Sequence, residues 1–383
     1  MISEEQIVGV AKRENNKKRN YLIVNRLQGK HVPVSPKLTF QMFEQLKNKV
    51  EVCYKDEQLL LVGFAETATA IGAYLATRMD TLYMQTTREK IAGVEYLYFS
   101  EEHSHATEQK LVKDDLDKII DGIDRIVFVE DEVTTGKTIL NIINIIKRQY
   151  GDKIHFSVAS IINGMNQEAF DNYKNLDIPV HFILRQNNEA YSEVAEKYRG
   201  DGHYVMCDTS YVYYDNSDSA DVDDSGHFSY RHHCVSRDYQ NPRRLVRGAE
   251  YLMSCESLFN SIKQEVDINC TGKEILVLGT EELMFPAIFI ASKLEKAGNI
   301  VYTHSTTRSP IEVSTEEEYP LHNRFELRSV YDDGRVTFIY DLKKYDKVII
   351  ITDSEQSESK GINSLINALR TENNDNIELI RWL

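Results

Sequence analysis

Apolar runs alternate with amphipathic stretches along residues 20–200. Runs such as 126–129 are continuous rather than alternating, which is typical of parallel strands buried on both faces. The stretches between them have the spacing of helices that cover a sheet. This alternation predicts a parallel α/β sheet. We expect its strands at 21–27, 59–64, 81–87, 96–102, 125–131, 155–162 and 180–185, and its helices at 36–47, up to Leu75, and at 139–149.

The pattern is lost over residues 204–241, where tyrosine, serine, aspartate and histidine dominate, and it returns after Tyr251. We therefore divide the chain into a first domain at 1–203, a connecting segment at 204–241 and a second domain at 242–383. In the second domain we expect strands at 274–279, 300–307, 335–341 and 347–353, and helices up to Ala297 and at 362–369.

The second half repeats the first in outline. The aligned segments are 62–76 with 278–291, 85–88 with 305–308, and 127–146 with 349–369. In this alignment Gly63 lies opposite Gly279, each after an apolar strand and before a helix, and Asp131 lies opposite Asp353. Three matches in the same order predict two related α/β domains in tandem, the second of them diverged.

The composition is that of a soluble globular protein, because 42% of the 383 residues are hydrophobic and 27% are charged. At about 150 residues per domain, this length suits two domains. The 60 acidic residues outnumber the 45 basic ones and give a net charge of -15, which opposes non-specific binding to nucleic acid. Any phosphate-bearing ligand must therefore be held by a local site.

No apolar run approaches the roughly 18 residues of a membrane span, so we expect no membrane crossing. The N-terminus is charged and lacks the apolar region of a secretory signal, which predicts a cytoplasmic protein. The five cysteines are odd in number and include no C-x-x-C pair. They predict free thiols rather than a disulfide framework or a zinc site.

The stretch 126–140, IVFVEDEVTTGKTIL, is the most informative part of the chain. An apolar strand ends in two adjacent acids, Glu130 and Asp131, and continues into a loop of hydroxylated residues and glycine that opens a helix. Backbone N–H groups and hydroxyls at a helix N-terminus favour an anion, so residues 134–138 are a candidate phosphate cradle. A nucleotide P-loop is the weaker alternative, because Asp131 stands where that motif requires its first glycine.

Two other polar stretches match no template. The acidic run 215–226 has Ala220 where a calcium loop needs glycine, and Gly226 where it needs glutamate, so we interpret it as a solvated loop. Four potential metal ligands follow, but their spacing fits no zinc template and favours a structural or surface role. They are His227, His232, His233 and Cys234.

The strand, the two acids and the Thr-Thr-Gly-Lys-Thr loop closely resemble the phosphoribosyl pyrophosphate (PRPP) signature of type I phosphoribosyltransferases, particularly the orotate-type branch. The resemblance implies that Glu130 and Asp131 hold the ribose hydroxyls and belong to the catalytic residues. It assigns the 5′-phosphate to Thr134, Thr135, Gly136, Lys137 and Thr138. Lys137 departs from the family, which more often has a small residue there, and could bind phosphate or point to solvent.

The same resemblance assigns two flanking elements. Lys30 and His31 lie in the place of an N-terminal hood that covers the base, and are candidates for contacting the acceptor, with surface placement as the alternative. The loop after strand 59–64 looks like the one that holds pyrophosphate through backbone N–H groups. Its residues are Gly63, Phe64, Ala65, Glu66 and Thr67.

Residues 85–109 lie in the place of the family's mobile catalytic loop. Arg88 and Lys90 could neutralise the leaving pyrophosphate. His103 or His105 could help to close the site or move a proton. A solvated loop is the alternative for the whole region.

The string THSTTRSP at 303–310 adds a second resemblance. Together with the PRPP-type domain, it makes nearly the whole chain similar to two-part proteins with a phosphoribosyltransferase and a TRSP domain, found among bacterial stress and tellurite-resistance systems. This implies two tandem phosphoribosyltransferase-like domains with mainly parallel sheets and a nucleoside-like product. In the second domain Thr352 stands where the first has Glu130, so we expect that PRPP binding is lost there.

The second domain keeps residues that could still form a site for an anion, with an inert packing domain as an equal alternative. The site would consist of Gly279, Thr280, Glu281, Thr307, Arg308 and Ser309. Three arginines are expected to lie near it as anion holders, namely Arg243, Arg244 and Arg247.

The resemblance as a whole implies a Mg²⁺-dependent phosphoribosyltransferase. It would move the phosphoribosyl group of PRPP to a base-like small molecule and release pyrophosphate, with Mg²⁺ held mainly by PRPP oxygens. A non-catalytic PRPP-sensing regulator of the same fold is the alternative. A PRPP synthetase is disfavoured, because its PRPP signature lies in the C-terminal half. The protein could assemble as a homodimer.

Overall fold

The computed structural model describes residues 3–14, 16, 19–99, 109–207, 230–268, 270–356 and 359–383. The chain forms two compact units. We call residues 40–190 and 240–254 the middle unit, and residues 1–39, 191–239 and 255–383 the terminal unit. The predicted division at 203 and 242 differs from this one, because both ends of the chain belong to the terminal unit.

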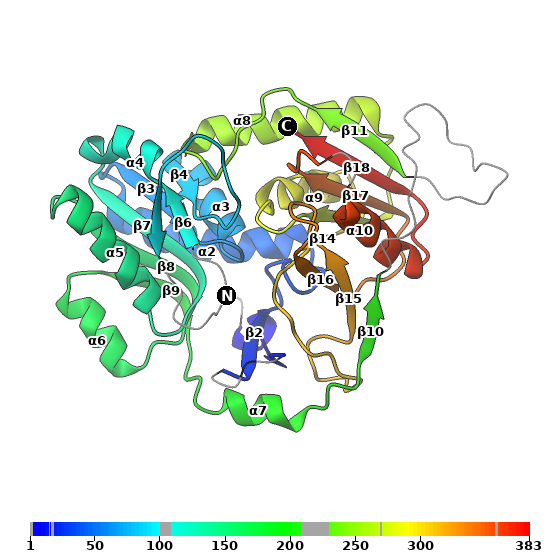
Figure 1. Ribbon diagram of the computed structural model, residues 1–383, viewed down its shortest axis with the longest axis horizontal. Coiled ribbons are helices and arrows are strands. Elements are labelled where there is room, and N and C mark those ends of the chain that lie inside the picture. Colours follow the sequence, from blue (N-terminus) through cyan, green and yellow to red (C-terminus); the bar gives the residue numbers. More distant parts are fainter. Residues whose placement is uncertain are drawn as a thin grey trace. The chain divides into compact units, whose positions relative to one another are not determined.

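The middle unit is built on a six-stranded sheet. Neighbouring strands are parallel from β4 to β9, and β12 pairs antiparallel with β4 at the edge. In order across the sheet they are β12 (Val246–Arg247), β4 (Leu82–Gln85), β3 (Leu59–Gly63), β7 (Arg125–Val133), β8 (His155–Asn163) and β9 (Val180–Arg185). The predicted parallel strands at 59–64, 81–87, 125–131, 155–162 and 180–185 are thus confirmed, and β7, β8 and β9 can be followed side by side in Figure 1. The strand predicted at 96–102 is not, because its described part, Tyr96–Phe99, does not join this sheet.

Helices and a short hairpin complete the middle unit (Figure 1). The helices are α2 (Pro36–Tyr54), which begins in the terminal unit, α3 (Thr69–Met79), α4 (Lys113–Ile119), α5 (Lys137–Tyr150) and α6 (Gln167–Asn175). A single 3₁₀ turn at Ile120–Gly122 follows α4. The antiparallel hairpin consists of β5 (Tyr96–Phe99) and β6 (Gln109–Val112). Helix α3 packs on β3, β4 and β7, where its small apolar side chains are buried.

The terminal unit contains a five-stranded, fully parallel sheet. Its strands in order are β11 (Arg231–Val235), β18 (Ile377–Trp382), β17 (Lys347–Thr352), β13 (Glu274–Gly279) and β14 (Ile300–Ser305). A second, mixed sheet joins β10 (His203–Met206), β15 (Asn323–Arg328) and β16 (Val336–Tyr340). A hairpin pairs β1 (Val8–Lys12) with β2 (Tyr21–Asn25).

The helices of the terminal unit are α1 (Glu4–Ile7), α7 (Tyr191–Lys197), α8 (Gly248–Glu265), α9 (Phe285–Lys296) and α10 (Lys360–Thr371). Helix α8 begins in the middle unit. Helix α9 packs on β13, β14 and β17, as α3 does on the matching strands of the middle unit. Apolar residues of β13, β15, β17 and α10 form one continuous core.

The two parallel sheets share strand order and register. The order β4-β3-β7-β8 in the middle unit matches β14-β13-β17-β18 in the terminal unit. Gly63 pairs with Gln85 on one side and Val129 on the other, while Gly279 pairs with Ser305 and Ile351. The segments that align in sequence therefore occupy corresponding positions in space.

Some elements differ from the predictions. The strand predicted at 21–27 does not join the parallel sheet, because β2 forms a hairpin with β1 in the terminal unit. Strands β15 and β18 and helix α6 were not predicted, because polar residues interrupt their apolar periodicity. Helix α8 was also not predicted, although its buried residues Tyr251, Cys255, Leu258 and Ile262 recur at helical spacing.

A glycine substitution tests the turn that opens α5. Gly136 has φ +73°, and a Cβ there would lie 2.6 Å from the ring of Tyr173, whose hydroxyl donates to the Gly136 carbonyl. Gly93 has the same φ of +73° and open space around it. Gly93→Ala should cost only backbone strain, about 1 kcal/mol. Gly136→Ala should lower the free energy of unfolding, measured by urea denaturation, by about 1 kcal/mol more, because the added Cβ also overpacks the contact with Tyr173. If the two substitutions lower the free energy of unfolding equally, the close contact between Gly136 and Tyr173 is contradicted.

Candidate functional site

The acidic pair lies at the carboxyl edge of the middle sheet. Val129 of β7 pairs with Gly63, the last residue of β3, so Glu130 follows at the point where the loop 63–67 begins. Thr67 Oγ1 donates to Asp131 Oδ1 at 2.8 Å. The predicted pyrophosphate loop and the predicted ribose-binding acids are therefore brought together at one edge of one sheet, where ligands bind in open α/β folds.

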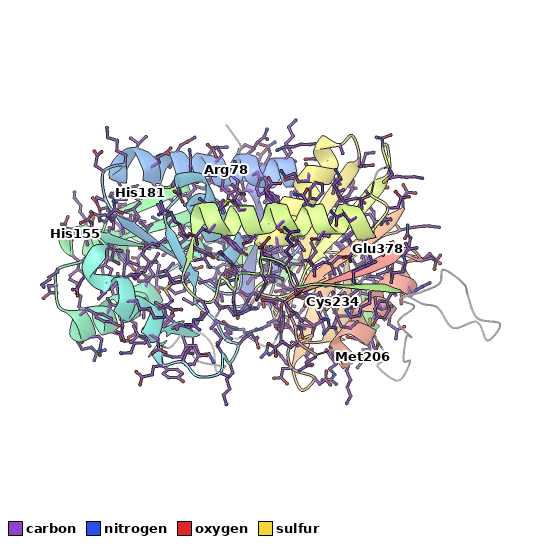
Figure 2. The ribbon with its side chains drawn as sticks, turned by 90° about the horizontal axis from the view of Figure 1, so that it is seen from above. Arg78, His155, His181, Met206, Cys234 and Glu378 are labelled. Atoms are coloured by element: carbon purple, nitrogen blue, oxygen red, sulfur yellow. The ribbon has the colours of Figure 1, made fainter. Side chains whose placement is uncertain are left out.

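Burial controls the charge of Asp131. Removal from water raises the pKa of this carboxyl, and the hydrogen bonds from the Thr67 hydroxyl and the Glu132 N–H group only partly oppose the shift. No described histidine of the middle unit is at this edge. His155 and His181 lie at the amino ends of β8 and β9 (Figure 2).

The loop 134–138 leads into α5, a helix of 14 residues. Gly136 is its N-cap, in the left-handed conformation, and Lys137 is its first residue. The Lys137 N–H group donates to Thr135 Oγ1 at 3.3 Å, whereas the Lys137 side chain is exposed. The predicted phosphate cradle thus consists of hydroxyls and glycine at a helix N-terminus, which favours an anion.

The loop 63–67 is held tightly from inside. Phe64 N–H donates to Val129 O, and Ala65 N–H donates to Thr86 Oγ1. The peptide bond between Ala65 and Glu66 is cis. We predicted that the backbone N–H groups of this loop hold pyrophosphate. At Phe64 and Ala65 these groups are already used within the protein, so contacts from the loop would have to come from the residues after Ala65.

The region 85–109 is described only in part. His103 and His105 lie outside the described residues. Arg88 is partly buried and Lys90 is exposed, after Thr87, whose N–H and carbonyl both pair with Lys110 on β6. Thr86 and Gln109 bond to the loop 63–67 but were not predicted as site residues. In the sequence they are marked only as polar residues next to apolar strands.

Lys30 and His31 lie in the terminal unit and are buried. Lys30 Nζ donates to the carbonyls of Glu281, at 2.7 Å, and Thr306, at 2.9 Å. The ring of His31 lies edge-on to Tyr340, with 6.5 Å between ring centroids. The predicted role for these two residues was contact with the acceptor. The structure instead makes them internal polar residues of the terminal unit.

In the terminal unit, the position of the predicted anion is taken by a side chain of the protein itself. The carboxylate of Glu281, which is fully buried, accepts from Arg308 Nε at 2.7 Å, Arg335 Nη1 at 3.0 Å and Ser329 Oγ. Glu282 lies 3.6 Å from Arg308. We predicted Arg308 as a binder of an external anion, and the structure shows it bound to an internal carboxylate.

The other residues of the predicted second site are also internally bonded. Thr280 Oγ1 contacts the hydroxyls of Tyr331 and Thr352, and Ser309 N–H donates to Thr307 Oγ1. Gly279 is required by close approach, because a Cβ would lie 2.4 Å from the carbonyl of Leu283.

Asp353, which aligns with Asp131, accepts hydrogen bonds on both carboxylate oxygens. Tyr331 donates to Oδ1 at 2.6 Å and Tyr239 to Oδ2 at 3.0 Å. The matching acid of the middle unit accepts from a threonine instead. The carboxyl group in the terminal unit is therefore committed to two tyrosines.

The three arginines predicted near the second site belong to the middle unit. Arg244 binds Asp115 through Nε and Nη2, and Arg247 binds Asp80 in the same way. Arg243 is buried. The ion pairs of Arg244 and Arg247 join the segment 240–254 to the rest of the middle unit.

No group of three or more His, Cys, Asp or Glu side chains that could hold a metal occurs within the described ranges. No helix in the described part of the chain is both long and apolar enough to cross a membrane.

Residues 7–187 match the family described as phosphoribosyl transferase (PRTase_2). Residues 249–369 match the TRSP domain C-terminal to PRTase_2. The chain therefore belongs to the phosphoribosyltransferase class, among the pentosyltransferases. Within this class it is a member of the family in which the transferase domain is followed by a TRSP domain, as the THSTTRSP string predicted.

Solved structures with similarity to the chain include adenine phosphoribosyltransferases. The enzyme from Rhodothermus marinus is 17% identical, with 48% of this chain and 96% of that one covered at a TM-score of 0.34. The Giardia lamblia enzyme, complexed with 9-deazaadenine, is 12% identical (47% and 94% covered, TM-score 0.35). The Trypanosoma brucei enzyme, in complex with AMP, pyrophosphate and ribose-5-phosphate, is 13% identical (47% and 77%, 0.34). No curated protein sequence matches the chain.

The raised pKa of Asp131 predicts a stability cost that depends on pH. Wild-type stability should fall as the pH rises from 3.8, the ordinary value for aspartate, through the raised pKa, because the unfolded chain ionises first. Asp131→Asn should therefore gain stability relative to wild type over this window and keep the gain at pH 7. Urea unfolding of both proteins from pH 3.5 to 8 measures this difference in the free energy of unfolding.

Asp115→Asn provides the opposite control. Burial raises the pKa of Asp115, but hydrogen bonds from Arg244 and Lys118 outweigh burial and hold it well below its usual range. Asp115→Asn should lose stability, on the order of 1 to 3 kcal/mol, at pH 7. If both variants change the free energy of unfolding at pH 7 in the same direction, the environments assigned to Asp131 and Asp115 are contradicted.

Proposed function

We propose that the chain is a PRPP-dependent phosphoribosyltransferase. It transfers the phosphoribosyl group to a base-like small molecule and releases pyrophosphate. The observation that carries the proposal is the pairing of Gly63 with Val129, together with the hydrogen bond from Thr67 to Asp131. These contacts bring the pyrophosphate loop and the acids for the ribose hydroxyls to one edge of the sheet.

Each part of PRPP has a complementary group in the middle unit. Glu130 and Asp131 accept hydrogen bonds from the ribose hydroxyls. The loop 134–138 binds the 5′-phosphate at the start of α5, where the helix dipole and N–H groups favour negative charge. The loop 63–67 and Arg88 receive the pyrophosphate, whose charge grows as it leaves.

The reaction requires charge relief and positioning rather than a covalent intermediate. The bond from the anomeric carbon to the pyrophosphate oxygen breaks, and the electron pair leaves with pyrophosphate. A nitrogen of the acceptor bonds to that carbon, and its proton passes to the released pyrophosphate. Mg²⁺ fits this scheme as a companion of PRPP, because it usually binds through one or two carboxylates and phosphate oxygens. The acids at 130–131 supply carboxylates of that kind.

The terminal unit does not bind PRPP in this proposal and is a diverged, phosphoribosyltransferase-like domain. Three observations support this reading: the shared strand order, the carboxylate of Glu281 in the place of an anion, and the two tyrosines on Asp353. The expected setting is a cytoplasmic one, in the synthesis of a nucleoside-like metabolite linked to stress or tellurite resistance.

Loss of the acidic pair should weaken PRPP binding. Glu130→Ala combined with Asp131→Ala should weaken binding by about 1 to 3 kcal/mol for each charged hydrogen bond lost. Titration calorimetry with PRPP and Mg²⁺ measures it. The control is Asp121→Ala combined with Glu168→Ala, which removes two charges from exposed positions of the same unit. Unchanged affinity in the first double variant would refute the assignment.

Arg88→Ala should reduce turnover more than PRPP affinity, because the guanidinium charge matters most as pyrophosphate departs. A fall in kcat of about tenfold to a hundredfold is expected, with a smaller change in the PRPP dissociation constant. Arg148→Ala, at an exposed position in the last turn of α5, is the control. Equal losses would make Arg88 an ordinary binding residue, and a wild-type chain that binds PRPP without turnover would favour the regulator.

A further inference from the structure

The backbone of Ala65 is held from both sides by buried side chains. Its N–H group donates to Thr86 Oγ1 at 2.8 Å, and its carbonyl accepts from Gln109 Nε2. The Thr86 hydroxyl donates to Gln109 Oε1 at 2.6 Å. Gln109 is only 2% exposed, and Thr86 is fully buried. The three residues form a closed ring of hydrogen bonds around one residue of the loop 63–67.

The chemistry of this ring requires an amide side chain. A carbonyl oxygen can only accept, so Gln109 must turn its NH₂ group to Ala65 and its oxygen to the Thr86 hydroxyl. A carboxylate would face the Ala65 carbonyl without a proton to donate. An apolar side chain would leave buried polar groups unsatisfied.

The same clamp recurs in the terminal unit with a different side chain. Glu281 aligns with Ala65, and its N–H group donates to Thr306 Oγ1 at 3.0 Å. Its carbonyl accepts from Lys30 Nζ at 2.7 Å, in the role that Gln109 has in the middle unit. Two units with unlike sequences therefore fix the same loop residue by a threonine and a long polar side chain.

We infer that Gln109 is a positioning residue for pyrophosphate. It fixes the backbone of the loop 63–67 in the form that receives the leaving group. The inference rests on the function proposed above. Because Phe64 and Ala65 use their N–H groups inside the protein, the later residues of the loop must make the contacts, and the clamp on Ala65 sets where those residues lie.

The first test uses the full-length chain with Mg²⁺ and two separate probes, inorganic pyrophosphate and ribose 5-phosphate. Gln109→Met should weaken pyrophosphate binding about tenfold, the loss of one buried hydrogen-bonded group. Ribose 5-phosphate binding should be unchanged, because its groups lie at 130–138. Gln41→Met makes the same substitution at an exposed position of α2 and should change neither. Titration calorimetry measures all of these affinities.

The second test uses pH. Gln109→Glu cannot donate to Ala65 while the new carboxylate is ionised, but its neutral acid form can donate to Ala65 and still accept from Thr86. The ratio of variant to wild-type pyrophosphate affinity should therefore be low at pH 8 and rise toward one as the pH falls to about 5, close to the range in which a buried carboxyl gains its proton. A residue that only supports packing would show no such recovery.

The outcomes separate this inference from the proposed function. If wild type binds neither probe, the proposed function fails and the inference fails with it. If wild type binds pyrophosphate and Gln109→Met binds it equally well, only the inference fails. The inference is also overturned if Gln109→Met loses affinity for both probes equally and the pyrophosphate affinity of Gln109→Glu does not recover at low pH. It is supported if Gln109→Met loses affinity for pyrophosphate alone and the pyrophosphate affinity of Gln109→Glu recovers at low pH.

Discussion

The pairing of β3, which ends in glycine, with β7, which carries two acids directly after the residue paired with that glycine, is the constraint on which the site depends. Because β3 and β7 are parallel, their carboxyl ends meet at one edge, and the register of Gly63 with Val129 sets which residues meet there. A shift of one residue would turn each side chain of the strand to the opposite face. The acids, the loop 63–67 and the start of α5 are thus placed by one ladder of backbone hydrogen bonds.

The terminal unit has the same strand register but different side chains at this edge of its sheet. Gly279 and Ile351 repeat the register, yet the adjoining loop carries Glu281, whose buried carboxylate satisfies Arg308 and Arg335. Removal of one partner from such a buried cluster would leave an uncompensated charge, which is strongly destabilising. The backbone of this loop is also clamped, with Lys30 as the donor, so different side chains hold the corresponding loop residue in the two units.

Periodicity alone predicted the strands at 59–64, 125–131 and 274–279 and the helix at 139–149, because buried parallel strands and amphipathic helices leave strong patterns. The acidic pair could be found because two acids after an apolar strand are unusual. The places of Lys30 and Arg244 could not be predicted, since their partners lie 251 and 129 residues away along the chain. The role of Gln109 could not be predicted either, because its hydrogen bonds to Thr86 and Ala65 join residues that only the tertiary fold brings together.

The electrostatics of the middle unit fit the proposed binding of PRPP better than they fit maximal stability of the fold. A chain with net charge -15 repels phosphates at a distance, so attraction must come from short-range donors such as the hydroxyls and N–H groups at 134–138. The same site holds Asp131 in surroundings that raise its pKa, which costs folding free energy at neutral pH. Ribose hydroxyls that donate to this carboxylate would offset part of the lost hydration. A group that destabilises the free protein and gains partners from a ligand is the pattern expected of a binding residue rather than of a structural one.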